Sequence, residues 1–503
     1  MTRDYSSNTW MLRVLVLLGV IALQLCMALP RVPKPFIDGR LHTTYDNAAL
    51  LHRAIHSNDE TISEPAKFFG QSRYAYRQGK PSGVYHNGSH GVLGPTCLRI
   101  FIGLFGKSEA AMRSFTLCVS VLSTILLFLL IVTEIPRLRL TAVIMTLYVC
   151  FPIKYMYVDV WKYESVAEAS MLAVVLALRH IERRAGFVAF LALVFLMFHA
   201  DFMPYLFAVG LVVHLFLRRK KDGNLWVWTT LVGFASVAAA YVIQSRVLGY
   251  TRERIAEKLA SRTGEHTQHL SELGLTSSLV QTATEGVGET PLVLALFLGV
   301  ALVASREIFR SSTAYFGVVL FSIQTLWTLM FRSHVFVHPY AHWFYAPAVI
   351  LILAASLKVC GAKEWLNNRM VNVASISILV LLLINFVDTR VLLLRDESSR
   401  FGTASDSAAL QKVTGRLLTL PDVPPGWWTS PVQKLYCDPI WRGSAGARIT
   451  PIEKMGKMRS GDTIAVRNTQ AARQQARKFV EKFGLKANRV MLESTSLVFF
   501  AVE

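Results

Sequence analysis

Residues 105–133 read FGKSEAAMRSFTLCVSVLSTILLFLLIVT, a short charged segment followed by an uninterrupted apolar run. The run itself, 114–133, contains no charged side chain. A helix needs about 20 apolar residues to cross the hydrocarbon core of a bilayer, and this run is long enough. The stretch therefore predicts a membrane-spanning helix that is entered from a charged segment, 107–113, at the membrane surface.

Apolar runs of this kind recur through most of the chain. Hydrophobic residues make up 53% of the sequence and charged residues only 17%, whereas about a quarter of a soluble domain is charged. We read the first run as an uncleaved membrane helix rather than a signal peptide, because no small-residue cleavage site follows it. Together the runs predict about eleven transmembrane helices, at Trp10–Leu29, Phe115–Thr133, Leu138–Pro152, Val166–Leu178, Phe187–Phe198, Tyr205–Leu217, Trp226–Ile243, Pro291–Ala304, Ala314–Phe331, Trp343–Leu357 and Val371–Phe386.

The loops between these runs alternate in character. Every second loop is short and rich in Lys and Arg, at 137–139, 179–184, 218–221, 306–310 and 358–369. Positive loops resist translocation, so this side and the N-terminus are predicted to face the cytoplasm. The long first loop, 30–113, and the tail, 391–503, then lie on the outer face. We attribute the net charge of +20 to this membrane topology and expect no nucleic-acid partner.

The tail after about residue 390 reads as a separate, small α/β domain. Apolar spans stop near Phe386, and the following segment contains Pro and Gly residues typical of loops. Strands are predicted at Ser430–Cys437, Asp462–Arg467 and Leu497–Val502. Thr469–Phe483 has helical periodicity and is followed by Gly484, a residue that commonly ends helices.

Several features of the first outer loop occur in an order that can be compared with known families. An acidic residue, Asp46, precedes a short predicted helix; His86 and His90 lie in a Gly-rich turn; a helical stretch, Val92–Phe105, follows; and FGKSEAAMR leads into the second span. This order resembles the GT-C-fold glycosyltransferases, such as dolichyl-phosphate-mannose-type mannosyltransferases, the lipid A aminoarabinose transferase and protein O-mannosyltransferases. The resemblance implies an all-α polytopic, GT-C-like membrane domain at 1–390, while the domain at 391–503 lies outside the matched part.

The resemblance also implies a reaction. Similar enzymes move a hexose or pentose, with inversion, from a polyprenyl-phosphate-linked donor to an acceptor that is a lipid, a glycan or a protein. An acid in the first outer loop acts on the acceptor, and the matching residue is Asp46, with Asp38 as the alternative. A carboxylate within hydrogen-bond reach activates a sugar hydroxyl by taking its proton. Family members often carry a second, adjacent acid, but Asn47 stands there, so no metal ligand is assigned and a divalent metal stays an open question.

Two further outer turns carry ionisable residues. Similar enzymes place a second acid in the turn at 154–164, where Asp159 and Glu164 are the candidates. An interfacial belt, in which Lys154 and Lys162 reach to the membrane surface, is the alternative reading of this aromatic-rich turn. In the turn after the fifth span, His199 and Asp201 form either a helix-end pair or, with His86 and His90, part of the substrate cavity.

The ninth span ends in a turn rich in basic residues, Arg332 to His342. Its spacing matches no metal-binding helix motif. The leaving group of the implied reaction is a phosphate, which needs fixed positive charge, and a guanidinium binds phosphate in a bidentate manner. We therefore predict a donor-phosphate site; the alternative is a polar interfacial turn. The predicted phosphate-binding residues are Arg332, His334, His338, His342 and Lys162.

Other functions remain alternatives at this point. A transporter or flippase of lipid-linked sugars should carry ionisable or helix-breaking residues in the middle of its spans, and few are visible. A polysaccharide polymerase or ligase would have its long outer loop late in the chain, and a non-catalytic scaffold leaves the His-rich turn unexplained. The single sequon, at Asn87, and the scattered cysteines favour a bacterial inner membrane with the site facing the periplasm; the endoplasmic reticulum is the alternative.

Overall fold

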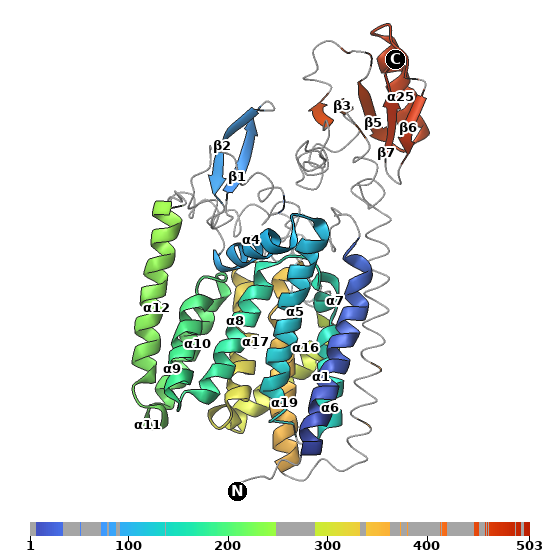
Figure 1. Ribbon diagram of the computed structural model, residues 1–503. Coiled ribbons are helices and arrows are strands. Elements are labelled where there is room, and N and C mark those ends of the chain that lie inside the picture. The colour runs from blue at the N-terminus through green and yellow to red at the C-terminus, as the bar shows by residue number, and fades with distance from the viewer. Residues whose placement is uncertain are drawn as a thin grey trace. The chain divides into compact units, whose positions relative to one another are not determined.

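The computed structural model describes two compact units, and each is considered separately (Figure 1). The first comprises Met1–Pro30, Glu64–Leu98 and Ser114–Arg390; the second comprises Arg31–Ser63, Arg99–Arg113 and Val391–Glu503. The described residues are 7–33, 51, 72–77, 80–86, 91–135, 137–247, 287–331, 339–362, 373, 380, 413, 415–419, 447–451, 458, 460, 462–487, 489–493 and 497–502.

Long apolar helices make up the first unit, with two helices running on into the second. The helices are α1 (Ser7–Ala28), α4 (Leu93–Phe105), α5 (Glu109–Ile131), α6 (Leu138–Cys150), α7 (Pro152–Tyr157), α8 (Tyr163–Ala177), α9 (Arg184–Met197), α10 (Met203–Leu217), α11 (Arg219–Asp222), α12 (Leu225–Val242), α16 (Glu289–Ala304), α17 (Ser312–Met330) and α19 (Tyr345–Ala362). Short helical turns are η1 (Leu29–Arg31), η2 (Leu178–His180), η3 (Ile243–Val247), η4 (Glu307–Phe309) and η5 (Pro339–His342).

The predicted spans coincide with these helices from the first to the tenth. The last predicted span, Val371–Phe386, lies almost entirely outside the described residues. Within the described part, four helices are long and apolar enough to cross a membrane, at Trp10–Arg31, Glu109–Ile131, Leu225–Ser245 and Ser312–Met330. Large apolar side chains such as Trp10, Phe234 and Phe297 are 68%, 70% and 70% exposed, which suits lipid and not water. The chain is thus an integral membrane protein.

Helices of the first unit pack side by side (Figure 1). The helix α8 lies against α9 and α10, α10 and α19 both lie against α17, and α1 lies against α6. The contact between α17 and α19 is close because Gly317 has no side chain; a Cβ there would stand 3.0 Å from the backbone nitrogen of Ile352. Such close approach at a small residue is the usual way in which membrane helices associate.

A hairpin between the first two predicted spans was not predicted. Strands β1 (Ser72–Arg77) and β2 (Lys80–His86) pair antiparallel. His86, expected in a Gly-rich turn between two helices, is instead the last residue of β2. The predicted helical stretch Val92–Phe105 is confirmed as α4.

The tail folds around a mixed sheet in the second unit. Its strand order is β4-β3-β5-β7-β6, with β3 parallel to β4 and β5, and β7 antiparallel to β5 and β6. The strands are β3 (Gly415–Thr419), β4 (Ala447–Pro451), β5 (Thr463–Arg467), β6 (Arg489–Glu493) and β7 (Leu497–Ala501), and helix α25 spans Gln470–Glu481. The elements β5, α25 and β7 confirm the sequence prediction, β3, β4 and β6 were missed, and the strand predicted at Ser430–Cys437 lies outside the described residues.

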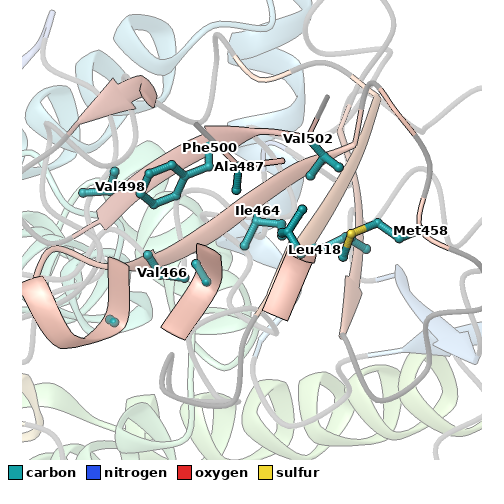
Figure 2. Packing of buried hydrophobic residues seen from close by; sticks show 11 residues of the cluster. Leu418, Met458, Ile464, Val466, Ala487, Val498, Phe500 and Val502 are labelled. Atoms are coloured by element: carbon teal, nitrogen blue, oxygen red, sulfur yellow. The ribbon is translucent and has the colours of Figure 1, made fainter. Parts of the chain in front are cut away.

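The core of this sheet domain shows why α25 forms where it does (Figure 2). Ala472, Ala476 and Val480 recur every fourth residue, are buried, and pack with sheet residues such as Ile464 and Phe500. The side chain of Thr469 accepts a hydrogen bond from the backbone N–H of Ala472 at 3.2 Å, which caps the start of the helix. After its end, Gly484 adopts a φ of 72°, as predicted for a helix-terminating glycine.

Candidate functional site

The turn between α7 and α8 is more deeply buried than an interfacial belt would be. Lys154, Asp159 and Lys162 are 7%, 0% and 1% exposed. The aromatic rings of the same turn are also enclosed: Trp161 stacks on Phe115 with ring centroids 5.6 Å apart. The belt interpretation, with lysines reaching out to the surface, therefore does not describe this turn. Its charged groups lie inside the helical unit.

One carboxylate organises this buried region. Glu168, in the second turn of α8, is 2% exposed and receives donors from three other elements. The hydroxyl of Tyr148 donates to its Oε1 at 2.7 Å, and the indole N–H of Trp343 donates to its Oε2 at 2.7 Å. The ammonium of Lys154 forms an ion pair with the same Oε2. Burial lowers the pKa of Lys154, and the carboxylate of Glu168 opposes that shift.

Aromatic rings extend the cluster towards Lys162. The ammonium of Lys154 lies 4.0 Å from the centroid of the Trp343 ring, and Trp343 lies against Tyr157 with centroids 6.5 Å apart. The ammonium of Lys162 lies 5.6 Å from the centroid of the Tyr157 ring. A cation over an aromatic face is stabilised by the ring quadrupole. A continuous series of contacts thus runs from Glu168 through Lys154, Trp343 and Tyr157 to Lys162. We call these five residues and Tyr148 the Glu168 cluster.

The turn before α19 is fixed by the helix α17. The side-chain amide of Gln324 donates to the carbonyl of Ala341 at 2.8 Å and accepts from the backbone N–H of Phe344 at 3.2 Å. His342 in this turn is fully buried, and its ring lies parallel to that of Tyr345 at 5.8 Å. Neither ring nitrogen hydrogen-bonds within the described part of the chain. Burial lowers the pKa of His342 to about 3, so its imidazole is neutral at physiological pH.

The residues just before α4 meet the turn at His199. The backbone N–H of Leu93 donates to the carbonyl of His199 at 2.8 Å. Gly91 permits this approach, because a Cβ there would be 2.1 Å from the same carbonyl oxygen. A Cβ on Gly94 would be 2.6 Å from the Trp161 ring, so the same segment also lies on the α7–α8 turn. Two turns that are distant in sequence are therefore joined by residues 91–94.

His199 and Asp201 are nearly buried, at 6% and 7% exposed. Burial lowers the pKa of His199 below its ordinary value. A small cavity lies beside His199. The cavity is lined by Gly91, Val92, Phe198, His199, Ala240, Ile243 and Gln244.

Only some of the remaining predicted site residues are among those that the structure describes. Glu164 lies in the first turn of α8 and is half-buried. Only the backbone of His86 is described. Asp38, Asp46, His90, Arg332, His334 and His338 lie outside the described residues. Their predicted roles stay predictions. Among the described residues, no group of three His, Cys, Asp or Glu side chains could hold a metal ion.

Sequence reasoning missed Glu168, although a signal was present. It is an acidic residue inside the predicted span Val166–Leu178, and an ionisable group within a span usually marks a functional or paired position. Tyr148, Trp343 and Gln324 carried no comparable signal. Their role depends on which helices become neighbours, and the sequence does not state this.

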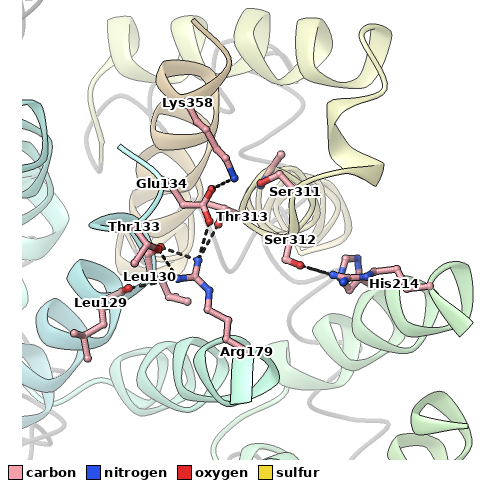
Figure 3. Close-up of polar contacts among 12 residues, drawn as sticks. Leu129, Leu130, Thr133, Glu134, Arg179, His214, Ser311, Ser312, Thr313 and Lys358 are labelled. Atoms are coloured by element: carbon pink, nitrogen blue, oxygen red, sulfur yellow. Dashed lines mark hydrogen bonds and ion pairs between the residues drawn. The ribbon is translucent and has the colours of Figure 1, made fainter. Parts of the chain in front are cut away.

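A second polar network lies at the other end of the same helices (Figure 3). Glu134 follows α5 and accepts hydrogen bonds from Lys358 at 2.6 Å and Arg179 at 3.2 Å. Arg179 also donates to the carbonyl of Leu130 at 2.8 Å and to the hydroxyl of Thr313 at 3.2 Å. This Glu134 network consists of residues from the basic loops that were predicted to face the cytoplasm, and from the helix ends beside them.

Comparison with known proteins identifies solved structures that have a similar fold. No family model and no curated protein matches this sequence. ArnT from Cupriavidus metallidurans, in its crystal structure bound to undecaprenyl phosphate, is similar with a TM-score of 0.52 and 12% identity over 99% of this chain and 98% of that chain. The apo oligosaccharyltransferase from Archaeoglobus fulgidus gives a TM-score of 0.49 and 13% identity over 89% of this chain and 65% of that chain. The similarity to ArnT shows that this chain has a GT-C-like fold and confirms the resemblance found in the sequence.

Proposed function

We propose that this chain is a membrane glycosyltransferase that moves a sugar from a polyprenyl-phosphate-linked donor to an acceptor on the outer face of its membrane. The observation that carries the proposal is the match of its fold to ArnT over nearly the whole of both chains. The buried charges of the α7–α8 turn support it, since desolvated ionisable residues cluster at functional sites. Asp159 and Lys162 belong both to this buried turn and to the residues that the sequence assigns to the reaction.

The proposed chemistry needs a base for the acceptor and cations for the donor phosphate. Asp46 is the proposed base and Asp38 its competitor, with Asp159 or Glu164 as the second acid. A single displacement by the activated acceptor hydroxyl breaks the bond between the sugar and the phosphate and inverts the anomeric centre. Fixed positive charge stabilises the departing phosphate.

The protonation state of His342 reduces the number of residues that we propose as contacts to the donor phosphate. Its neutral, fully buried ring supplies no positive charge. We therefore propose Arg332 and Lys162 as the principal phosphate contacts, with His334 and His338 beside them and His342 as a packing residue of the turn. His86, His90, His199 and Asp201 remain proposed residues of the substrate cavity.

The proposed setting follows the sequence prediction. About eleven spans place the N-terminus in the cytoplasm and the domain at 391–503 on the outer side, in the periplasm if the membrane is a bacterial inner membrane. The acceptor class is a lipid, a glycan or a protein.

A transporter or flippase of lipid-linked sugars is the second candidate. The observation that favours it is Glu168, an ionisable residue inside α8 and within a predicted span. Glu168 is paired with Lys154, however, and lies only five residues from the outer start of the helix. That position suits a site at one face of the membrane better than a site at its midplane.

Transfer of labelled sugar by the purified chain in lipid tests the proposal. Native protein should transfer the sugar from polyprenyl phosphate, and Asp46→Asn should abolish transfer, because the amide removes the base and little volume. Asp222→Asn is the matched control, because it makes the same substitution directly after the basic loop at 218–221. This variant should transfer the sugar normally. Loss with Asp38→Asn alone would move the base to Asp38. No transfer by native protein with a panel of donors and acceptors, together with movement of a labelled lipid across the bilayer, would favour the flippase.

A further inference from the structure

The proposed chemistry gives no role to Glu168, although donors from three separate segments converge on its carboxylate. Its two oxygens accept from Tyr148 of α6, Lys154 of α7 and the Trp343 indole before α19. Helix α7 and the turn η5 also touch directly. One carboxylate thus joins the turn that carries Lys162 to the segment from η5 to the start of α19.

We propose that Glu168 is a positioning residue: it fastens the α7–α8 turn to the η5–α19 turn and so fixes the position of Lys162, the described cation that is proposed to bind the donor phosphate. The inference rests on the proposed transferase function and names the residue that pre-organises its site. Glu168 has no reacting role in the proposed chemistry. It acts through Trp343 and Tyr157, which lie between it and Lys162.

The chemistry of the cluster suits positioning more than simple cohesion. Helices in a membrane associate well through apolar and small residues, as α17 and α19 do at Gly317. Burying a carboxylate and an ammonium costs desolvation, which often leaves such a pair no more stabilising than an apolar contact. What the ion pair adds is a restriction on the relative orientation of the groups that it joins. A carboxylate with short hydrogen bonds in a low-dielectric interior allows few alternative geometries.

The three donors also restrain different degrees of freedom. The indole N–H of Trp343 fixes the start of α19, and Gln324 fixes the residues just before it. Lys154 fixes α7, and its ammonium lies against the Trp343 ring at 4.0 Å. A shift of either turn would break a contact to Glu168. Displacement of reacting groups by about 1 Å can cost roughly 100-fold in rate, so this restraint is large enough to matter for transfer.

Hydrogen exchange measured on the native chain in lipid provides the first test, and it does not depend on activity. Glu168→Gln should raise exchange in peptides from 152–162 and 339–345, while Glu168→Asp should restore much of the protection. Glu134→Gln is the matched control at the other end and should leave both peptides unchanged. Equal exchange in native and Glu168→Gln protein at these turns would overturn the inference, whatever the transfer assay shows.

Kinetics of sugar transfer provide the second test. Glu168→Gln should lower kcat by roughly 100-fold per folded molecule, with a much smaller change in the KM of the acceptor. Trp343→Phe removes one donor to Glu168 and keeps the ring, so it should lower kcat in the same direction if Glu168→Gln fails to fold. Normal kcat in folded Glu168→Gln and Trp343→Phe would reduce Glu168 to a structural role and overturn the inference. Absence of transfer by native protein is a separate result, which contradicts the proposed function itself.

Discussion

Glu168 and Glu134 are two carboxylates that each gather several donors from separate helices, but they do so in different surroundings. The side chains of Glu168 and Lys154 are 2% and 8% exposed, whereas those of Glu134 and Lys358 are 14% and 49% exposed. The Glu134 network also serves the backbone, because Arg179 donates to a carbonyl at the end of α5, as basic residues near helix ends commonly do. Among the described residues, the hydrogen bonds to the carboxylate of Glu168 come from side chains.

This difference separates two uses of buried charge. The Glu134 network satisfies groups that the helix ends leave open, so the architecture alone explains it. Within the part of the chain that the structure describes, no backbone group hydrogen-bonds to the carboxylate of Glu168. The carboxylate of Glu168 lies beside the turns that carry the proposed site, where packing alone does not require a charge. A need to hold these turns in one geometry explains it best.

Removing the partner of Glu168 should have the largest effect. Lys154→Met leaves the carboxylate buried without a counter-ion, and losing one member of a buried pair costs about 3–5 kcal/mol. The free energy of unfolding, measured by denaturant titration in lipid or detergent, should fall by that amount. The double variant Lys154→Met/Glu168→Gln should recover a large part of it, since no unpaired charge remains. A double variant that loses the sum of the two single losses would show that the pair is not coupled.

Acid should destabilise the turn before α19 through His342. Its pKa is lowered to about 3 in the folded chain, against 6.5 for the free side chain, so the folded state binds fewer protons between these values. Its contribution to stability is complete above pH 6.5 and is lost as the pH falls towards 3. Between pH 7 and pH 4.5 the loss from this residue amounts to roughly 3 kcal/mol.

The variant His342→Phe isolates that contribution from the other titrating groups. Phenylalanine keeps the ring beside Tyr345 and removes the proton-binding nitrogens. The free energy of unfolding of the variant should therefore fall less than that of native protein over the same pH range. Parallel pH profiles would mean that His342 is exposed or protonated in the folded state.

The sequence predicted the helical unit well because its signal is local. An apolar run such as 114–133 reports its own environment, and α5 lies where that run is. The same reasoning placed β5, α25 and β7 in the tail. It missed the hairpin β1–β2, since short strands paired across a tight turn give weak patterns among polar residues.

The candidate site was less predictable because its geometry is not local. Lys154 looked like an interfacial lysine, and only the neighbouring α8 and Trp343 make it a buried ion pair. His342 stood in a basic turn that suggested a phosphate site, yet its burial against Tyr345 makes it neutral. In both cases the tertiary environment decides the role of the side chain, and the spacing of residues along the chain does not reveal that environment.

The smallest effect is expected at Glu134. Glu134→Gln keeps an oxygen for Arg179 and Lys358 but removes the charge, and partly exposed ion pairs contribute about 0.2–1 kcal/mol. Salt distinguishes the two ends more sharply than the mutation alone. Raising the ionic strength shortens the screening length to about 3 Å at 1 M, so it should erase most of the difference between Glu134→Gln and native protein. The loss caused by Lys154→Met should persist at the same salt concentration, because solvent ions do not reach a pair this deeply buried. Equal salt sensitivity of both variants would show that the Glu168 cluster is open to solvent, and the contrast between the two ends would then fail.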